Sequence, residues 1–477
     1  MKQWSTYQQN IFDFVKSGSG NGVVQAVAGS GKTTTIVEAL KYVKGSHLFL
    51  AFNKSIALEL CARKVNAKTF HSLTFQPVIK SQGVNTVNGN KMRDIAKSYF
   101  VSKEKSDKLY RSFCLKLVGL GKNAGIGIFT QNTSESWEAL VAHHDLSLDS
   151  EHAVLADALQ ITCQLFEASL QSKQVDFDDL LYLSVKNELS LPKFDFIFVD
   201  EAQDTNSIQR AIRKKIMRPG SRIIAVGDPA QAIYGFRGSD SQSIAMIEKE
   251  FQAERFPLTV TYRCPTKVVE FARQYCDTLE AAPNAPEGAV FEPGLDWDIN
   301  ALAPGDLVVC RLSRPLIKLG YELLKARKPF FIVGQEFGEG LKKLVRGFAA
   351  ESIEDLEKRL TSWKDREVQK CLNKDDEAMA EVISDKAECL FCLMSEVDTI
   401  QALERTIDHL FAVKADATRL STVHKAKGLE ADKVFWLNSS QCPSKWAKQE
   451  WQVQQELNIC YVAATRAKKE LHLIEIV

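Results

Sequence analysis

The sequence lacks the marks of a secreted or membrane-spanning protein. Its first residues, Met1–Gln8, contain no apolar run of the kind found in signal peptides. The strongest apolar stretches, such as His47–Phe52, are far shorter than the roughly 20 residues that cross a bilayer, and they fit buried strands. Repeats and low-complexity tracts are also missing. We therefore expect a globular protein of the cytoplasm without membrane contact.

An excess of charge of either sign is absent as well. The chain has 61 Lys and Arg residues against 60 Asp and Glu residues, which gives a net charge of +1. A polycation that coats nucleic acid is therefore excluded. Any nucleic-acid surface must be a local basic stripe, balanced by acidic surface elsewhere.

The eleven cysteines carry little pairing signal. Their number is odd and they are scattered along the chain, so we expect reduced thiols. Cys389 and Cys392 form one CxxC. A metal site would need two more ligands, for which Cys371 and Cys442 are the loose candidates. We expect no metal site there.

The sequence does contain two regions in which strands and helices alternate, which predicts parallel α/β sheets. Its 477 residues are enough for two to four domains. In the first region we expect strands at Gly22–Val27, His47–Phe52, Phe194–Val199 and Arg222–Val226, and helices at Lys32–Tyr42, Ser55–Arg63 and from Asp176 onward. A polar, helical stretch interrupts this region between about residues 84 and 173.

The second region follows a helix at Thr266–Leu279 and a stretch rich in Pro, Gly and Ala, residues 281–304. We expect strands at Leu307–Arg311, Pro329–Val333, Leu420–Val423, Lys433–Leu437 and Glu470–Val477. A charged helical stretch interrupts it at 339–415. The predicted domains are therefore 1–83 with 174–265, an insertion at 84–173, 266–338 with 416–477, and a small insertion at 339–415.

A phosphate-binding loop is predicted at Ala26–Thr33, where Gly31-Lys32-Thr33 stands between a strand and a helix. Gly29 and Gly31 let backbone N–H groups approach phosphate oxygens, and the helix N-terminus adds partial positive charge. Lys32 would hold the β- and γ-phosphates of ATP, and Thr33 would ligate Mg²⁺. Ala26 stands where the first glycine of the pattern is usual.

An acidic run, Asp200–Asp204, directly follows the apolar strand Phe194–Val199. The carboxyl end of such a strand lies beside the phosphate loop in this kind of sheet. Asp200 would hold Mg²⁺, and Glu201 would act as general base on the attacking water. The alternative for an acidic run taken alone is a solvated loop.

With these motifs in place, the chain from Gln8 to Lys468 resembles the UvrD/Rep family of superfamily 1 DNA helicases. The acidic box has the form typical of that family. The other matching segments are Gly227–Gly238, Thr261–Arg263, Thr422–Glu430 and Tyr461–Ala467. The resemblance implies two RecA-like P-loop domains with parallel sheets, each carrying a helical insertion. It also implies a compact form, similar to phage helicases and to the motor of the F-box DNA helicases, with no room for an F-box or a C-terminal tail.

The resemblance also assigns roles at the nucleotide. Gln8 fits the glutamine that reads the adenine edge, although Gln9 is an alternative. Tyr262 would stack on adenine, Glu430 would bond the ribose, and Gln231, Arg263 and Arg466 would reach the γ-phosphate. The remaining contacts to ATP would come from the loop residues Ala28, Gly29, Ser30, Gly31, Lys32, Thr33 and Thr34.

A further set of residues would line single-stranded DNA: Asn53, Lys54, Thr69, Phe70, His71, Tyr234, Phe236, Arg237 and His424. Aromatic faces stack on any base at about 1–3 kcal/mol each, which suits a motor that ignores sequence. Phe236 stands where the family often has Trp. The alternative for Phe70 and Phe236 is that both are core aromatics.

The expected protein is thus a monomeric, ATP- and Mg²⁺-dependent DNA helicase that moves 3′ to 5′ along a single strand. Its partners would be single-stranded and tailed duplex DNA, with replication or repair proteins as further candidates, in the nucleoid or in the host cytoplasm of a phage. Alternatives are an RNA helicase, a translocase that strips proteins without unwinding, and a binding module with a dead ATPase. The last is disfavoured because Lys32, Asp200, Glu201 and Arg466 are all present.

Overall fold

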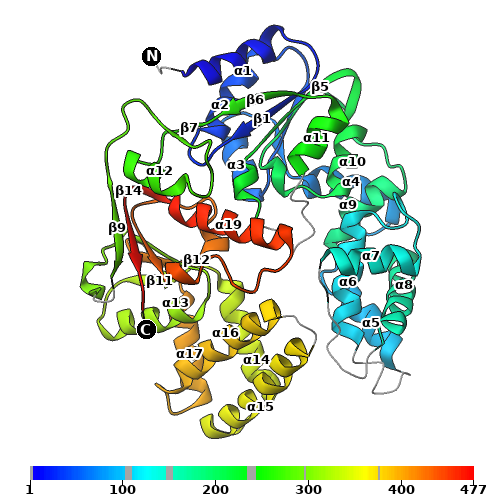
Figure 1. Ribbon diagram of the computed structural model, residues 1–477. Coiled ribbons are helices and arrows are strands. Elements are labelled where there is room, and N and C mark those ends of the chain that lie inside the picture. The colour runs from blue at the N-terminus through cyan, green and yellow to red at the C-terminus, as the bar shows by residue number, and fades with distance from the viewer. Residues whose placement is uncertain are drawn as a thin grey trace. The chain divides into compact units, whose positions relative to one another are not determined.

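The computed structural model describes residues 4–101, 110–144, 146, 154–233, 243–294, 297–373 and 377–476. The chain divides into two compact units. The first unit comprises Met1–Val27 and Gly31–Thr259, and the second comprises Ala28–Ser30 and Val260–Val477. Each unit is built around its own parallel sheet (Figure 1). No helix within these described ranges is both long and apolar enough to cross a membrane.

The sheet of the first unit has six parallel strands in the order β3-β2-β4-β5-β1-β6. The strands are β1 (Gly22–Ala26), β2 (His47–Leu50), β3 (Ala67–Lys68), β4 (Phe194–Val199), β5 (Met217–Gly227) and β6 (Glu254–Leu258). The four strands β2, β4, β5 and β1 are flanked on both sides, and their apolar runs suit burial on both faces.

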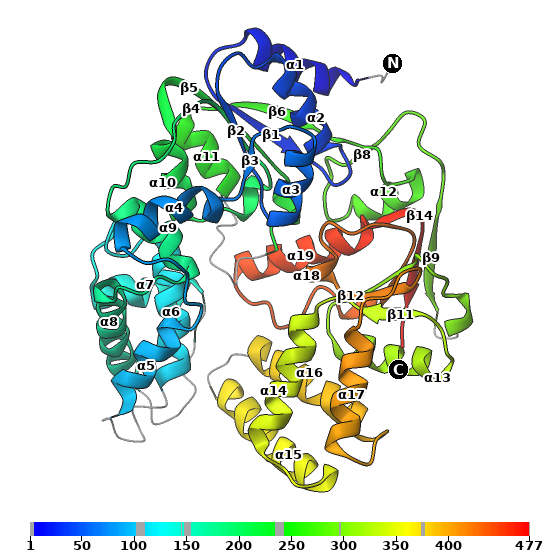
Figure 2. The same ribbon diagram turned by 180° about the vertical axis from the view of Figure 1, so that it is seen from behind.

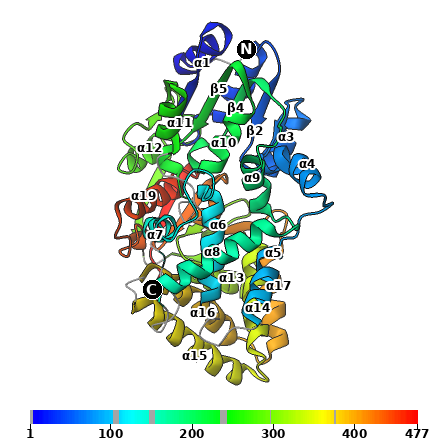
Figure 3. The ribbon, with the colours of Figure 1, turned by 90° about the vertical axis from the view of Figure 1, so that its right-hand side faces the viewer.

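Successive residues of β4 divide between the two faces of this sheet. Phe196 and Phe198 pack with α1 (Thr6–Ser17), α2 (Lys32–Ala39) and α3 (Lys54–Ala62). Ile197 and Val199 pack on the opposite face with α4 (Phe70–Gln82), α9 (Phe177–Lys186), α10 (Ser207–Lys215) and α11 (Ser243–Phe251). Figure 3 shows β5, β4 and β2 between α11 on one side and α3 on the other. The sheet therefore lies between two layers of helices.

A helical insertion occupies the chain between β3 and β4. It contains α5 (Lys91–Val101), α6 (Arg111–Ala124), α7 (Ser134–His143) and α8 (Leu155–Gln171). These helices share one apolar core with α4 and α9, and they lie together in Figure 1. The insertion is thus packed onto the sheet-covering helices of its own unit.

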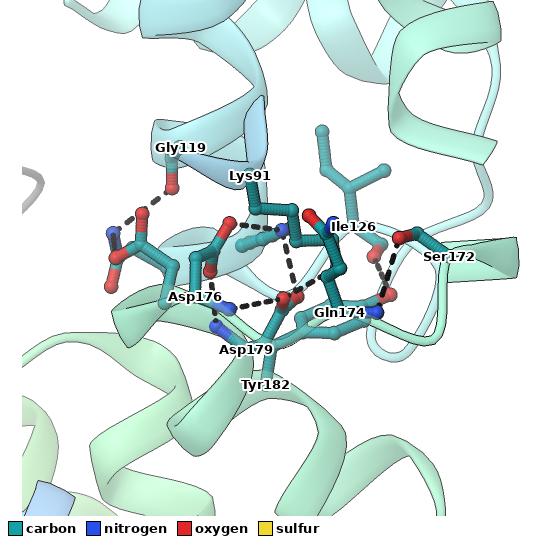
Figure 4. A network of polar contacts seen from close by, with 11 residues as sticks. Lys91, Gly119, Ile126, Ser172, Gln174, Asp176, Asp179 and Tyr182 are labelled. Atoms are coloured by element: carbon teal, nitrogen blue, oxygen red, sulfur yellow. Dashed lines mark hydrogen bonds and ion pairs between the residues drawn. The ribbon is translucent and has the colours of Figure 1, made fainter. Parts of the chain in front are cut away.

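A buried charge network ties the insertion to α9 (Figure 4). Asp179 on α9 accepts from Lys91 Nζ of α5 at 2.6 Å and from Lys122 Nζ of α6 at 2.7 Å. Asp176, which caps α9, accepts from Lys122 at 3.3 Å and exchanges hydrogen bonds with Asp179 in a capping box. The side chains of Lys91 and Asp179 are fully buried. Three helices are therefore joined by one carboxylate.

The sheet of the second unit also has six parallel strands, in the order β11-β12-β10-β13-β14-β9. They are β9 (Ala289–Gly294), β10 (Leu307–Cys310), β11 (Phe330–Ile332), β12 (Thr418–Thr422), β13 (Ala431–Leu437) and β14 (Ala467–Ile474). A short parallel pair, β7 (Val260–Thr261) and β8 (Glu280–Ala281), stands apart from it.

One face of the second sheet carries α13 (Arg314–Lys325) and the second helical insertion. That insertion comprises α14 (Gln335–Phe348), α15 (Ile353–Leu372), α16 (Glu377–Met394) and α17 (Ile400–Phe411), and Figure 2 shows it as one bundle. Three further helices, α12 (Thr266–Ala272), α18 (Val423–Ala426) and α19 (Glu450–Ala464), pack together and against β9, β10, β12 and β14.

The predicted fold class is confirmed: both sheets are parallel, and helices interrupt each alternating region. Two expectations need correction. The stretch 281–304, for which no strand was predicted, contains the edge strand β9, and the helix expected to reach Leu279 ends at Ala272. The predicted domain boundaries remain predictions; the two units separate after Thr259, six residues before the expected end of the first domain at residue 265.

Candidate nucleotide and nucleic-acid sites

The catalytic candidates of the first unit converge because three neighbouring strands end at one edge of its sheet. The order β4-β5-β1 places Asp200, Asp228 and the phosphate loop at the carboxyl ends of adjacent parallel strands. Ligands bind at this edge in open α/β sheets. Residues far apart in the sequence are thereby collected around one point.

The phosphate loop connects β1 to α2 and has the geometry that an anion requires. Gly29 and Gly31 both have positive φ, +71° and +80°. Gly31 is the N-cap of α2, and no side chain caps the helix there. Helix N-terminal N–H groups left without a side-chain cap bind phosphate oxygens well. Lys32 and Thr33 begin α2 directly at this point, so the loop fits ATP with Mg²⁺.

Gln8 lies close to this loop, whereas Gln9 does not. Gln8 Nε2 donates to Thr35 Oγ1 on α2 at 2.9 Å, and the residue is 4% exposed. Its Oε1 accepts from Ser5 N in the capping box of α1. Gln9 is exposed and donates to Asp13. The geometry favours Gln8 over Gln9 as the residue beside a nucleotide, and it adds Thr35, which the sequence analysis did not assign.

The acidic pair after β4 is held in an unusual backbone conformation. Asp200 is buried, and its Oδ1 accepts from Glu201 N at 3.0 Å. Glu201 has φ +47° and ψ 46°, a left-handed conformation that non-glycine residues adopt rarely. Such local strain tends to occur at functional sites. It suits the predicted roles of Asp200 toward Mg²⁺ and of Glu201 toward water.

Gln231 and Glu201 belong to one hydrogen-bonded chain. Gln231 Nε2 donates to Asp228 Oδ2 at 2.6 Å, and Asp228 N donates to Gln203 Oε1 at 3.0 Å. Gln203 Nε2 donates in turn to Glu201 Oε2 at 2.5 Å. Gln203 and Asp228 had no assigned role in the sequence analysis, because their contacts depend on the juxtaposition of β4 and β5.

In the second unit, Arg263 and Glu430 form an ion pair. Arg263 Nε lies 2.7 Å from Glu430 Oε2, and Lys468 Nζ lies 2.9 Å from Glu430 Oε1. Partial burial opposes ionisation of Glu430, but the bonds from Lys468 and Arg263 outweigh it and lower the pKa of this carboxyl. Two residues predicted to bind one nucleotide thus contact each other.

Arg466, predicted to reach the γ-phosphate, is a buried residue. It is 1% exposed, and its guanidinium donates to Val462 O at 2.9 Å and to Leu429 O at 3.3 Å. Arg466 directly precedes β14, and Glu430 directly precedes β13. These two strands are paired, with Ala431 opposite Ala467. The pairing places Arg466 and Glu430 at the same edge of the second sheet.

The tip of the phosphate loop, Ala28–Ser30, groups with the second unit. Tyr262 N donates to Gly29 O at 2.9 Å, and Ala28 N donates to Tyr461 Oη at 2.9 Å. The side chain of Tyr262 itself remains open, with 52% of the residue exposed. An exposed ring of this kind can stack on a base.

The nucleic-acid candidates of the first unit lie where β2 and β3 end. Asn53 caps α3 by accepting from Ile56 N, and Thr69 caps α4 by accepting from Ser72 N. Lys54 is the first residue of α3 and is exposed. In the order β3-β2-β4-β5-β1, these positions flank the nucleotide candidates on the same sheet edge.

Phe70 and His71 have different surroundings. Phe70 is 5% exposed and packs in the apolar core with Leu73, which favours the core alternative over a stacking role. His71 is partly exposed, and burial lowers its pKa. Its ring contacts that of Phe177 at 6.5 Å between centroids.

Phe177 is an additional candidate that the sequence analysis missed. It is 61% exposed at the first turn of α9, beside His71. Large exposed aromatic residues adjoining a polar candidate are a signal for base stacking. Its sequence position, inside the capping box of a helix, gave no indication of this exposure.

The remaining candidates are divided between two parts of the chain. His424 lies on α18 in the second unit and is partly exposed. Tyr234, Phe236 and Arg237 lie outside the residues that the structure describes. Their assignment to single-stranded DNA stays a prediction.

Comparisons with known proteins agree with both halves of this arrangement. The model of the UvrD/REP helicase N-terminal domain matches residues 7–252, and that of the UvrD-like helicase C-terminal domain matches residues 339–477. A probable DNA helicase II homolog of Mycoplasma pneumoniae is 26% identical over 601 residues, which cover 97% of this chain and 83% of the relative.

Two further relatives are longer proteins. F-box DNA helicase 1 of Gallus gallus is 23% identical over 500 residues, covering 94% of this chain and 46% of the relative. The ATP-dependent DNA helicase PcrA of Leuconostoc citreum is 25% identical over 293 residues, which cover 54% of this chain and 37% of the relative. The chain therefore matches less than half the length of each of these two relatives.

Proposed function

Because the chain belongs to the UvrD/Rep family of DNA helicases, we propose that it hydrolyses ATP to move along single-stranded DNA, 3′ to 5′, and to separate duplex ahead of it. One observation carries the proposal. The phosphate loop, the acidic pair Asp200–Glu201 and Gln231 meet at the ends of three adjacent parallel strands. That arrangement would supply the phosphate cradle, metal ligand, base and γ-phosphate contact that hydrolysis requires.

ATP would be held with Mg²⁺ by this edge of the first sheet. The uncapped N-terminus of α2 and Lys32 would bind the phosphates, and Thr33 and Asp200 would ligate the metal. Glu201 would take the proton of the attacking water. Gln8 would contact the adenine edge, since it lies against Thr35 at the start of the same helix.

The second unit would supply Arg263 and Arg466 to the γ-phosphate, with Tyr262 on the adenine and Glu430 on the ribose. Such arginines neutralise the charge that develops during phosphoryl transfer and are worth about 10³–10⁵ in rate. Arg263 is already paired with Glu430 through its Nε. Nucleotide binding would therefore add an ionic partner to Arg263 or exchange one for another.

Single-stranded DNA would cross the ends of β2 and β3. Lys54, Asn53 and Thr69 would contact the backbone there, and the Phe177–His71 pair would offer an exposed stacking surface. We propose that Tyr234, Phe236, Arg237 and His424 also contact the strand. Stacking and phosphate contacts carry no sequence code, which suits translocation.

Two alternatives use the same scaffold: an RNA helicase and a translocase that displaces proteins without unwinding. ATPase assays with single-stranded DNA and with RNA separate the first, and we expect stimulation by DNA. Stimulation by RNA alone would overturn the DNA assignment.

An unwinding assay with 3′-tailed and 5′-tailed duplexes tests activity and polarity together. We expect ATP-dependent unwinding of the 3′-tailed substrate, with Lys32→Ala as the inactive control. If the protein unwinds neither duplex but still hydrolyses ATP, the result would favour the translocase. Full ATPase activity in Lys32→Ala would remove the catalytic assignment.

A further inference from the structure

We propose that Gln203 is a positioning residue: its amide fixes the carboxylate of Glu201 and connects it to Gln231. The inference rests on the proposed hydrolysis of ATP and adds the means by which the general base is oriented. Gln203 is a single side chain that contacts both the acidic pair after β4 and the residues after β5.

Both ends of the Gln203 amide are engaged, which sets its orientation. Nε2 donates to Glu201 Oε2 at 2.5 Å and approaches Asp204 Oδ2 at 3.4 Å. Oε1 accepts from the Asp228 backbone N–H at 3.0 Å. An amide rotated by 180° would set its oxygen against Glu201 and its NH₂ against the Asp228 N–H, so the observed orientation is the one that satisfies all three partners.

The space for Gln203 is provided by Gly227, the last residue of β5. A Cβ at position 227 would lie 2.3 Å from Gln203 Oε1 and 3.1 Å from Gln203 N. The first distance is shorter than real Cβ atoms show, and the second is tighter than most Cβ contacts. The φ of Gly227 is not positive, so close approach rather than backbone freedom requires glycine here. Gln203 is 1% exposed in this space and cannot swing into solvent.

Glu201 needs such a partner because its backbone alone does not aim its side chain. The residue has left-handed dihedral angles and is only partly buried. A short hydrogen bond from a fixed amide holds Oε2 and so sets the direction of the carboxylate. Proton transfer requires a base within hydrogen-bond reach of its water, so misorientation slows the chemical step without affecting nucleotide binding.

The far end of the chain reaches the predicted γ-phosphate contact. Asp228 Oδ2 accepts from Gln231 Nε2 at 2.6 Å, and Asp228 Oδ1 accepts from Ala230 N at 3.1 Å. A movement of Gln231 toward a phosphate would break its hydrogen bond to Asp228 Oδ2. Asp228 also holds Gln203, because its backbone N–H donates to Gln203 Oε1. The state of the γ-phosphate is thereby linked to the orientation of Glu201 through buried groups of one unit.

The test uses the full-length protein and two substitutions of similar volume. Gln203→Glu keeps an oxygen that accepts from Asp228 N but cannot donate to Glu201. Gln203→Met removes both interactions. We expect kcat for ATP to fall about tenfold to a hundredfold in each, while KM and the Kd of a fluorescent ATP analogue with Mg²⁺ change less than about threefold. Gln160→Ala, an exposed glutamine of α8, is the matched control.

A double-mutant cycle separates positioning from a general structural role. Because Gln203 acts through Glu201, adding Gln203→Met to Glu201→Gln should lower single-turnover hydrolysis less than about twofold further. Gly227→Ala, which crowds Gln203 from the other side, should reproduce the loss of kcat. Thermal unfolding confirms that each variant is folded.

The outcomes distinguish this inference from the proposed function. If the wild-type protein hydrolyses no ATP, the proposed function fails. If wild type is active and Glu201→Gln is not, but both Gln203 variants keep kcat within about twofold of wild type, the positioning role alone is overturned. The positioning role would also be overturned if the rate loss in the double mutant equalled the product of the two single losses. A Glu201→Gln variant with normal kcat would overturn it as well.

Discussion

At the scale of single residues, exposure distinguishes the two phenylalanines near His71. Phe70 fills the core, whereas Phe177 presents its ring to solvent beside the imidazole. An aromatic ring left exposed at the edge of a sheet where ligands bind has little to contribute to folding. Its value lies in what it can contact, and a flat ring contacts nucleobases of any identity.

We predict that Phe177→Ala weakens binding of single-stranded DNA by about 1–3 kcal/mol, that is, about fivefold to more than a hundredfold. Basal ATPase activity without DNA should be unchanged, since Phe177 belongs to α9 and its ring contacts His71 of α4. Fluorescence anisotropy with a labelled oligonucleotide measures the affinity. Phe129→Ala removes another half-exposed phenylalanine and serves as control; equal losses in both variants would contradict the assignment.

Asp178, the neighbour of Phe177, makes stability depend on pH. Burial raises its pKa to about 6, with help from the nearby Asp176. A carboxyl whose pKa is higher in the folded state stabilises the fold when protonated. That stability is complete below its ordinary pKa of 3.8 and is lost as the pH rises through about 6.

We therefore expect Asp178→Asn to stabilise the protein by about 1–2 kcal/mol at about pH 8, and to have little effect near about pH 3. Urea unfolding at the two pH values measures the difference. Glu138→Gln changes an exposed carboxylate of α7 and should leave stability unaltered at both. A gain that is the same at both pH values would show that Asp178 is not the titrating group.

At the scale of elements, the insertion of the first unit depends on a few buried charges. Asp179 pairs with Lys122 and Lys91 on two different helices. Burial alone would raise the pKa of Asp179, but these two ammonium groups hold that pKa below its ordinary value. Removing one member of such a cluster leaves the others buried without full compensation.

Asp179→Asn is expected to lower the free energy of unfolding by about 3–5 kcal/mol, because two buried lysines lose their shared carboxylate. Arg63→Ala breaks an exposed pair with Glu59 in the same unit and should change stability by less than about 1 kcal/mol. Denaturant titration of both variants tests the contrast. Comparable effects would mean that the buried cluster adds nothing beyond a surface pair.

The elements differ in how well the sequence predicts them. Central strands such as β4 are largely apolar, and β4 was predicted with the bounds that it has. The edge strands β6 and β9 contain Pro257 and Pro293, and neither was predicted. Proline removes a ladder donor and is tolerated at sheet edges, so its presence hides these strands from a reading of local pattern.

The candidate site residues also differ in how well the sequence predicts them. The phosphate loop and the acidic pair are local patterns next to a strand, and both could be read directly. Gln203 and Phe177 could not, because the importance of each depends on a residue far away in the sequence: Asp228 for one and His71 for the other. Periodicity carries no information about such contacts.

At the scale of the whole molecule, the near balance of 61 basic and 60 acidic residues limits how DNA can be held. Affinity must come from a few local phosphate contacts, such as the one proposed for Lys54, rather than from net charge. Each contact displaces counterions, so the logarithm of the affinity for single-stranded DNA should fall linearly with the logarithm of salt concentration. Anisotropy titrations over a range of NaCl measure the slope, and a flat response would argue against the proposed path.

The ends of the first insertion meet where it leaves and rejoins the sheet-bearing part. Asn88 N donates to Val175 O at 2.7 Å, and Asn88 Nδ2 donates to Gln174 Oε1 at 2.9 Å. Because the two ends are joined by local bonds, the chain between them can lengthen at little entropic cost and without shifting the strands. The insertion is in this sense a replaceable module: related motors could exchange it for a larger or smaller one and retain the same catalytic edge.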